Sequence, residues 1–168
     1  MNIEKVAVIG AGLMGSGIAA HVANAGFPVT LLDIVPNGAT NRNVIAETAI
    51  KNMLKPVKMG SPTPLMHKEN SKLIKIGNIE DDIKLIGDAD LIIEVVLEKL
   101  EIKHNVFQKI DKYRKKNSIV TSNTSTIPRE ILIKGMPESF AKDFMIAHFF
   151  NPPRYLRLLE IVAGKEVS

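Results

Sequence analysis

A short apolar run that leads straight into a glycine-rich turn constrains the fold of this chain more than any other feature. The run Val6-Ala7-Val8-Ile9 predicts a strand buried on both faces, and the turn after it is Gly10-Ala11-Gly12-Leu13-Met14-Gly15. From Leu13 to Ala25 apolar residues recur at helical spacing, and Gly26 supplies a stop. A second apolar run, Val29-Thr30-Leu31-Leu32, predicts another strand. Together these segments predict one β-α-β unit.

The rest of the chain continues to alternate strands with helices. The sequence predicts helices over 43–54, 81–86 and 98–113, a first helical turn at Pro128, and strands over 90–96, 119–121, 144–147 and 158–162. This alternation is typical of a Rossmann-type α/β fold, with a doubly wound, mostly parallel sheet and helices on both faces. With 168 residues the chain can fill one core, so we expect a single domain over 1–168. The pattern stops directly after a strand, which suggests a longer parent protein.

The glycine turn has the form G-x-G-x-x-G and stands between a strand and a helix, the context in which it binds a dinucleotide. Gly10 permits the tight turn, Gly12 lets a pyrophosphate approach the backbone, and Gly15 lets the helix pack close to the strand. The helix N-terminus adds free N–H groups and the positive end of the helix dipole. A structural turn without a ligand is the alternative interpretation.

Asp33 closes the second predicted strand about 20 residues downstream, where a carboxylate can accept hydrogen bonds from the adenosine ribose hydroxyls. The same carboxylate would repel a 2′-phosphate, and Ile34 and Val35 offer no arginine to bind one. The sequence therefore favours NAD over NADP as the cofactor. The alternative is that Asp33 only caps the end of its strand.

Two titratable residues near the C-terminal end suggest a reaction. His148 follows the apolar run 144–147, which places an imidazole at the carboxyl end of a strand, where open α/β sheets bind their ligands. Glu160 lies within the apolar run 158–162, which we interpret as a second buried strand. Because a buried carboxylate is unfavourable unless it is paired, we expect Glu160 to face His148 and hold it as a base. A core histidine and a strand-edge carboxylate are the alternatives.

A cluster of hydroxyl side chains follows the strand predicted over 119–121. In the run Thr121-Ser122-Asn123-Thr124-Ser125-Thr126, five of the six residues carry a hydroxyl group. Such a cluster on its own is typical of a helix N-cap. Because this strand and the strand before His148 are expected to end at the same edge of the sheet, the cluster is predicted to add hydroxyl donors beside the base.

Composition excludes several classes of function. The net charge of +4 is compatible with phosphorylated ligands but too small and too dispersed to indicate nucleic acid. The absence of cysteine excludes disulfides, thiolate catalysis and zinc–thiolate sites, and we predict no metal site. The sequence contains no signal peptide and no spanning segment, so we expect no membrane partner and a cytoplasmic location.

Five motifs resemble, in order along the chain, those of the L-3-hydroxyacyl-CoA dehydrogenases of fatty-acid β-oxidation. They are the glycine turn, Asp33, Glu94-Val95-Val96-Leu97-Glu98 with Lys103, Ser122-Asn123-Thr124-Ser125, and His148-Phe149-Phe150-Asn151-Pro152 with Glu160. The resemblance covers essentially the whole chain. The form Asn151-Pro152-Pro153-Arg154-Tyr155 looks most like bacterial multifunctional members, in which an enoyl-CoA hydratase follows the dehydrogenase.

The resemblance implies an acyl-CoA substrate and a role for each residue that handles it. His148 would be the general base that takes the 3-hydroxyl proton while hydride leaves C3 for the nicotinamide, and an imidazole suits this because its ordinary pKa lies near neutrality. Glu160 would orient the ring and stabilise the imidazolium. Ser125 would hydrogen-bond the substrate oxygen, and Asn151 would help frame the pocket.

The same resemblance implies which residues bind the cofactor. Glu98, Lys103 and Asn123 would line the nicotinamide-ribose side. Leu13 and Met14, within the glycine turn, complete the set expected to contact NAD.

One part of the family pattern is missing from this sequence. Members of the family carry a second, all-helical domain that supplies a further active-site asparagine, much of the acyl pocket and the dimer contact, so we expect the full-length protein to be a homodimer through that domain. The segment 41–72 is expected to be a helical hairpin whose basic residues meet coenzyme A. Its lysines do not align securely with the family's contacts; they are Lys51, Lys55, Lys58, Lys68 and Lys72.

Two other functions stay open. One is a dehydrogenase of related fold that acts on a hydroxy acid without a thioester. The other is a regulatory or structural module that binds a dinucleotide without chemistry, against which the intact His148, Glu160 and Ser125 argue.

Overall fold

The computed structural model describes residues 2–56, 63–165 and 167, and within them seven strands form one sheet in the order β3-β2-β1-β4-β5-β6-β7. The strands are β1 (Val6–Ile9), β2 (Val29–Asp33), β3 (Ile74–Asn78), β4 (Leu91–Glu94), β5 (Ile119–Ser122), β6 (Phe144–Phe149) and β7 (Leu159–Ala163). Strands β1 to β6 pair in parallel, and β7 pairs antiparallel with β6. The predicted Rossmann-type fold is confirmed, because its six parallel strands follow the order 3-2-1-4-5-6.

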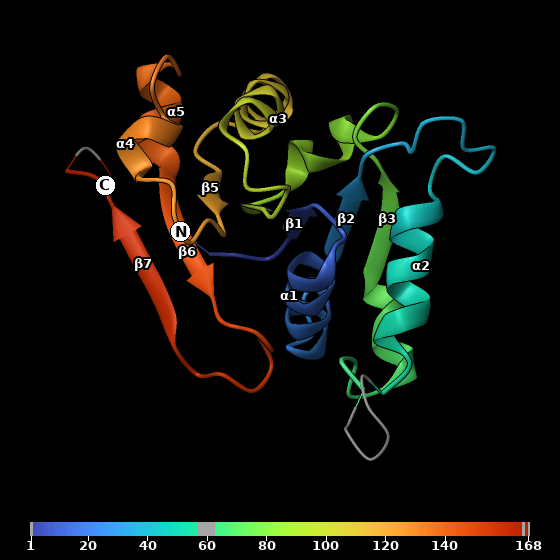
Figure 1. The fold of residues 1–168 in the computed structure, drawn as a ribbon. Helices are drawn as coiled ribbons and strands as arrows, with labels where there is room; N and C mark the ends of the chain where they lie inside the picture. Colours follow the sequence, from blue (N-terminus) through green and yellow to red (C-terminus); the bar gives the residue numbers. More distant parts are fainter. Residues whose placement is uncertain (1, 57–62, 166, 168) are drawn as a thin grey trace.

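Helices cover both faces of the sheet (Figure 1). The α-helices are α1 (Leu13–Asn24), α2 (Val44–Met53), α3 (Leu100–Tyr113), α4 (Arg129–Leu132) and α5 (Glu138–Asp143), and the 3-10 helices are η1 (Lys68–Leu73) and η2 (Ile83–Asp88). One hydrophobic cluster joins α1 and α2 to the sheet, and a second joins α3, α5 and η2 to the opposite face. Strand β1 contributes alternate residues to each cluster, which is why all four of its side chains are buried.

The sheet places the predicted site at one edge. The strand order reverses between β1 and β4, so the loops that leave their carboxyl ends diverge and leave a crevice, the usual ligand position in such sheets. Glu94 pairs in register with Ile9 on one side and with Ser122 on the other. His148 pairs with Glu160 across β6 and β7. The ends of β1, β4, β5 and β6 therefore bring the glycine turn, the hydroxyl cluster and the histidine to a common edge.

Two features of the middle of the chain differ from the sequence prediction. Strand β3 was not predicted, because Lys75 and Gly77 interrupt its apolar pattern; a charged residue and a glycine are tolerated there because β3 is an edge strand. The expected helical hairpin over 41–72 is also wrong for the described residues, which form α2 and then the short 3-10 helix η1. Lys58 and the start of the loop predicted at 61–64 lie outside the described residues.

Strand β7 corrects the expectation of a second buried strand. Every residue of β7 is exposed, including Ile161 and Val162 at 54% and 48% of their full accessible surface. The apolar run 158–162 indicated burial, but β7 is the last strand of the sheet and only β6 pairs with it. The position of Glu160 therefore does not rest on the burial from which we inferred it.

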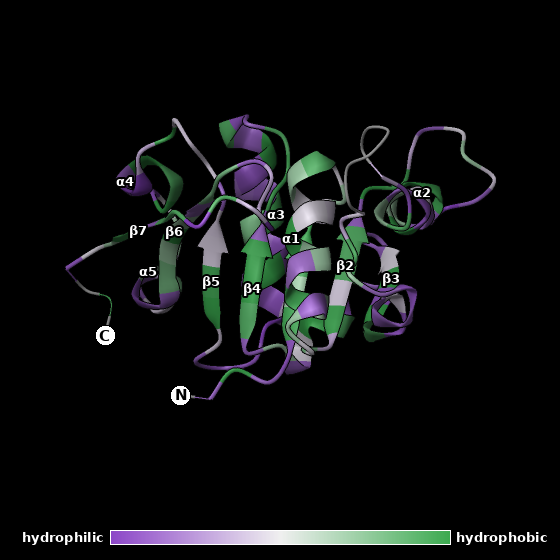
Figure 2. Ribbon diagram, turned by 90° about the horizontal axis from the view of Figure 1, so that it is seen from below, coloured by the Kyte–Doolittle hydropathy of each residue, from purple (hydrophilic) through white to green (hydrophobic). Residues whose placement is uncertain are grey.

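The hydropathy of the elements matches this layered arrangement. In Figure 2 strands β4 and β5 are mostly hydrophobic in colour, whereas the helices also show hydrophilic residues. Among the described residues, none of the helices combines the length and apolar character needed to cross a membrane.

Candidate dinucleotide-binding and active site

The glycine turn has the geometry that a pyrophosphate requires. Gly10 has a φ of +108°, and a Cβ atom there would lie 2.5 Å from the carbonyl oxygen of Val95. A Cβ atom on Gly15 would lie 1.8 Å from the carbonyl oxygen of Gly10, so helix α1 can pack this closely only with glycine. Gly12 is the N-cap of α1, has no side chain to cap the helix, and faces open space within 4 Å. The turn therefore offers uncapped N–H groups to a ligand.

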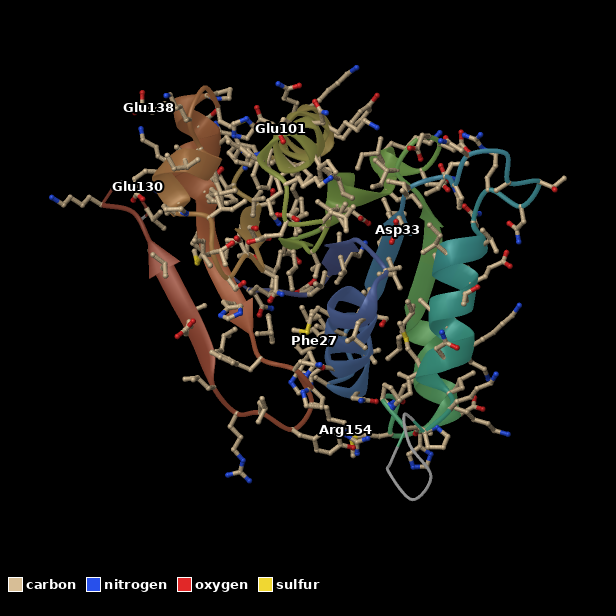
Figure 3. The ribbon with its side chains drawn as sticks, viewed as in Figure 1. Phe27, Asp33, Glu101, Glu130, Glu138 and Arg154 are labelled. Atoms are coloured by element: carbon tan, nitrogen blue, oxygen red, sulfur yellow. The ribbon has the colours of Figure 1, made fainter. Side chains whose placement is uncertain are left out.

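Asp33 lies at the end of β2 and is held against the glycine turn (Figure 3). Its carboxylate accepts hydrogen bonds from the backbone N–H groups of Ala11 at 2.5 Å and Ile34 at 2.6 Å. Both contacts fix the carboxylate beside the turn while leaving further lone pairs for ribose hydroxyls. This is the arrangement that an adenosine ribose needs.

The first basic residue after β2 is already neutralised. Arg42 donates two hydrogen bonds to Asp81, from Nε at 2.7 Å and from Nη2 at 2.9 Å. The hydrogen bond and charge of Asp81 raise the pKa of Arg42, and the hydrogen bond from Arg42 lowers the pKa of Asp81. Because this guanidinium is paired, the adenosine end carries the fixed negative charge of Asp33 without a free arginine from this loop, which agrees with NAD rather than NADP.

A second cleft begins at the glycine turn and ends at His148. It has a volume of about 490 Å³. Nine of the predicted site residues line it: Gly12, Leu13, Met14, Glu98, Lys103, Asn123, Ser125, His148 and Asn151. Gly10, Gly15, Asp33 and Glu160 do not line this cleft; the glycines lie under the turn, Asp33 lies beside it, and Glu160 lies behind the histidine. The cleft thus joins the expected cofactor turn to the expected base.

His148 and Glu160 form the predicted pair. Nδ1 of His148 lies 2.9 Å from Oε2 of Glu160, across the antiparallel pairing of β6 and β7. The Phe150 ring lies 4.7 Å from the imidazole, measured between ring centroids. The side chain of His148 is 20% exposed and that of Glu160 is 54% exposed. Because Glu160 occupies Nδ1, the other ring nitrogen, Nε2, is the one left for a substrate.

A buried ion pair lies on the opposite wall of the cleft. Lys103 on α3 is 1% exposed, and its Nζ lies 2.9 Å and 3.1 Å from the two carboxylate oxygens of Glu94. Glu94 is fully buried and also accepts hydrogen bonds from the N–H of Val96 at 2.7 Å and from Oγ of Ser122 at 2.6 Å. All acceptor positions of Glu94 are therefore used, as a buried carboxylate requires.

Glu98 shares the same ammonium group from the solvent side. Its Oε2 lies 3.1 Å from Nζ of Lys103, and its Oε1 accepts hydrogen bonds from the hydroxyls of Thr124 and Thr126. Partial burial raises the pKa of Glu98, but the hydrogen bond from Thr124 and the charge of Lys103 outweigh it, so the pKa lies below its ordinary value. Glu98 is therefore ionised at neutral pH.

The hydroxyl run after β5 organises the cleft instead of capping a helix. Helix α4 has Pro128 as its N-cap and no side-chain cap hydrogen bond. Asn123 accepts a hydrogen bond from the N–H of Phe149 at 2.8 Å, which ties the end of β5 to the residue after His148. Ser125 is exposed and lines the cleft beside His148.

Sequence reasoning missed the roles of Glu94, Ser122 and Thr124. The signal for Glu94 was present, since a glutamate closes the apolar run Leu91-Ile92-Ile93. The same argument about the unfavourable burial of a carboxylate that was applied to Glu160 applies with more force to Glu94, which is the one that is buried.

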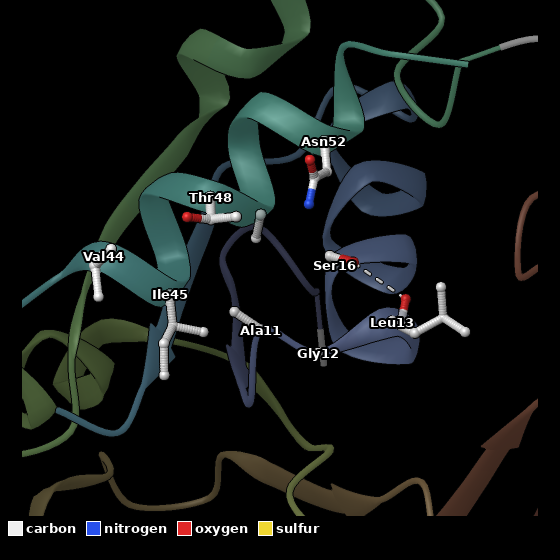
Figure 4. A pocket seen from close by; sticks show the side chains of 9 residues that line it. Ala11, Gly12, Leu13, Ser16, Val44, Ile45, Thr48 and Asn52 are labelled. Carbon is white, nitrogen blue, oxygen red and sulfur yellow. Dashed lines mark hydrogen bonds between the residues drawn. The ribbon is translucent and has the colours of Figure 1, made fainter. Parts of the chain in front are cut away.

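A further cleft lies between α1 and α2 and shares Gly12 and Leu13 with the cleft beside His148 (Figure 4). It has a volume of about 480 Å³. Apolar residues dominate its lining, with Ser16, Thr48 and Asn52 as polar members. The two clefts therefore meet at the glycine turn.

The fold and the site define a Rossmann-type dinucleotide-binding domain with a histidine–carboxylate pair at its ligand edge. Residues 5–168 match the family described as "3-hydroxyacyl-CoA dehydrogenase, NAD binding domain". The chain belongs to this family, and its cofactor is NAD.

Several known proteins are similar to this chain. A Deinococcus radiodurans protein named "Probable 3-hydroxyacyl-CoA dehydrogenase" is 47% identical over 96% of the chain. The "Peroxisomal fatty acid beta-oxidation multifunctional protein AIM1" of Arabidopsis thaliana is 34% identical over 99% of the chain. The crystal structure of 3-hydroxybutyryl-CoA dehydrogenase from Escherichia coli K12 superposes with a TM-score of 0.79, at 28% identity over 100% of the chain.

The chain is shorter than each of these proteins. It spans 46% of the Deinococcus protein, 22% of AIM1 and 34% of the Escherichia coli chain.

Proposed function

We propose that this chain is the catalytic NAD-binding half of an enzyme that oxidises L-3-hydroxyacyl-CoA to 3-ketoacyl-CoA in fatty-acid β-oxidation. The observation that carries the proposal is the single cleft that runs from the helix N-terminus at Gly12 to the paired imidazole of His148. A dehydrogenation needs a hydride acceptor and a proton acceptor at one carbon atom, and this cleft joins the expected positions of both.

The residues of the chain divide this reaction between them. His148 takes the proton of the 3-hydroxyl on Nε2, because Nδ1 donates to Glu160. Glu160 holds the ring orientation and stabilises the imidazolium that forms. Ser125, exposed beside the histidine, hydrogen-bonds the oxygen that changes from hydroxyl to carbonyl, and Asn151 closes the end of the cleft. NAD, when bound, supplies the hydride acceptor.

Cofactor placement follows from the charges and donors around the two clefts. The uncapped N–H groups of α1 hold the pyrophosphate, and Asp33 accepts from the adenosine ribose. Glu98, Lys103 and Asn123 line the cleft beyond the turn, where the nicotinamide ribose would lie. Leu13 and Met14 line the same cleft and cover the start of this path.

The cleft between α1 and α2 is our candidate for part of coenzyme A. It joins the active-site cleft at Gly12 and Leu13, so a thioester at His148 can continue into it. Its apolar lining suits a pantetheine arm, and Lys51 and Lys55 are exposed on and just after α2. A phosphorylated end of the substrate would meet these lysines.

The activity of the isolated chain is expected to be low. The chain spans under half of its relatives, and the family resemblance places the rest of the acyl pocket and the homodimer contact in a second domain. We therefore expect NAD binding with slow turnover, and a turnover near that of a complete family member would contradict this expectation.

Titration of the chain with NADH and with NADPH, followed by acetoacetyl-CoA at pH 7, tests the proposal. We expect tighter binding of NADH and a slow oxidation of NADH that depends on acetoacetyl-CoA. Binding of NADH without inhibition or oxidation by acetoacetyl-CoA would favour a hydroxy acid without a thioester. Failure to bind NADH would contradict the proposed function altogether.

A further inference from the structure

The charged groups on the cofactor side of the cleft do not cancel. Among the described residues that line this cleft, Glu98 and Lys103 are the charged ones, and Glu94 lies directly behind Lys103. Two carboxylates share one ammonium group, so this triad of Glu94, Lys103 and Glu98 has a net charge of −1. Glu94 and Lys103 are 0% and 1% exposed, so water and salt screen that charge poorly.

The contacts of Glu94 keep this charge in place. A backbone N–H, a serine hydroxyl and the ammonium group all donate to its carboxylate, which favours the ionised form. None of these contacts is needed to fold β4, which pairs with β1 and β5 through its backbone. Replacing the charged triad with apolar side chains would be an easier way to build a core, so its retention calls for an explanation in terms of the ligand.

We propose that Glu94 is a positioning residue that sets the preference of the site between the two redox forms of the cofactor. The nicotinamide ring is positively charged in NAD⁺ and neutral in NADH, whereas the rest of the molecule is the same in both. A fixed net charge of −1 beside the ring stabilises the oxidised form relative to the reduced form. The consequence is weaker retention of NADH relative to NAD⁺, which suits an enzyme that oxidises its substrate. This inference rests on the proposed position of the nicotinamide in the cleft.

The variant that tests this proposal is Glu94→Gln, because it removes the charge and keeps the size of the side chain. Its carbonyl oxygen can still accept from Val96 N–H and Lys103, and its amide can donate to Ser122 Oγ, whose hydroxyl can rotate. Lys103 also keeps its contact with Glu98. The net charge of the triad then rises from −1 to zero while the hydrogen bonds are preserved.

Two matched controls separate charge from packing. Ser122→Ala removes a hydrogen bond from Glu94 and leaves the charge of the triad unchanged. Glu138→Gln removes one carboxylate charge on α5, in an exposed pair with Lys142 that does not line the cleft.

The measurement is the ratio of the dissociation constants for NAD⁺ and NADH, the first by calorimetry and the second by fluorescence. For Glu94→Gln we expect the Kd for NAD⁺ to rise about five-fold, which corresponds to about 1 kcal/mol, while the Kd for NADH changes less than about two-fold. Both controls should keep the wild-type ratio. Equal shifts of both constants in Glu94→Gln would overturn the proposal and leave the proposed function intact, whereas loss of all binding in the unmodified chain would overturn both.

Glu98→Gln provides the same test if Glu94→Gln fails to fold. Glu98 is 38% exposed, so this substitution leaves the buried pair of Glu94 and Lys103 intact and still brings the triad to zero. Any contact between Glu98 and the ribose is common to both redox forms and cancels in the ratio. A ratio that moves toward NADH supports the proposal, and an unchanged ratio contradicts it.

Discussion

Glu94 and Glu160 each lie 2.9 Å from a basic side chain at the same edge of the sheet, but their surroundings are opposite. The pair of Glu94 and Lys103 is sealed in the protein, whereas Glu160 is more than half exposed beside His148. Breaking a buried pair leaves an uncompensated charge, whereas an exposed pair contributes little to stability. Distance alone therefore does not reveal what an ion pair does.

The two surroundings suit two tasks. A fully hydrogen-bonded, buried pair keeps a constant charge, which is useful next to a charged ring. A half-exposed imidazole beside an exposed carboxylate can take up a proton and release it to water. The comparison assigns fixed electrostatics to β4 and proton transfer to β6 and β7.

Removing the proton acceptor should give the largest change in activity. His148→Gln is expected to slow the acetoacetyl-CoA-dependent oxidation of bound NADH by about 10²–10⁴-fold, because general-base catalysis is lost. The Kd for NADH should stay within about two-fold, since the glycine turn is untouched. Single-turnover fluorescence measures both, with His21→Gln on α1 as the control. A rate equal to that of the unmodified chain would show that His148 is not the base.

Breaking the buried pair should give the largest change in stability. Lys103→Met leaves Glu94 charged and buried, so the free energy of unfolding should fall by about 3–5 kcal/mol in a urea titration. Lys109→Met, at an exposed position of α3, is the control. The double variant with Glu94→Gln should be more stable than the sum of the two single changes predicts, because neither charge then remains unpaired. Additive losses would mean that the pair is not coupled.

Breaking the exposed pair should hardly affect stability. For Glu160→Gln we expect the free energy of unfolding to change by less than about 1 kcal/mol, as for other exposed ion pairs. The same urea titration measures it beside Lys103→Met. A loss as large as that of Lys103→Met would remove the distinction between the two pairs.

The smallest expected effect is a difference in acid sensitivity. The pKa of Glu98 is lowered from its ordinary value of 4.5, so its ionised form stabilises the folded state above that pH. This contribution is lost as the pH falls through the folded-state pKa. Glu98→Gln should therefore lose less stability than the unmodified chain when thermal unfolding is compared between neutral pH and pH values below 4.5. Parallel profiles would contradict the lowered pKa.

The sequence predicts most of this fold because local patterns suffice for it. Buried runs such as Val6-Ala7-Val8-Ile9 are strands wherever the sheet is covered on both faces, and the glycine turn fixes the first β-α connection. Strand β3 escaped prediction because an edge strand does not need an uninterrupted apolar pattern. The exposure of β7 depends on which elements cover it, which a local pattern does not record.

The candidate site was predicted less evenly. His148 and Glu160 were expected to meet, and they do, although the burial argument used for Glu160 was wrong. The position of Lys103 in the cleft matched the prediction, but its lock on Glu94 did not follow from any short motif. The nine residues between these two side chains span a strand end, a loop and the first turn of α3, so their meeting depends on the tertiary fold.

The most direct test of the division between the two pairs is the single-turnover rate of NADH oxidation by acetoacetyl-CoA in Glu160→Gln, measured after fluorescence has shown that NADH saturates the sample. The account predicts saturation at the same NADH concentration as in the unmodified chain and a rate at least about ten-fold lower, a smaller loss than the roughly 10⁴-fold expected for a buried catalytic carboxylate. An unchanged rate at saturation, accompanied by weaker NADH binding, would contradict it.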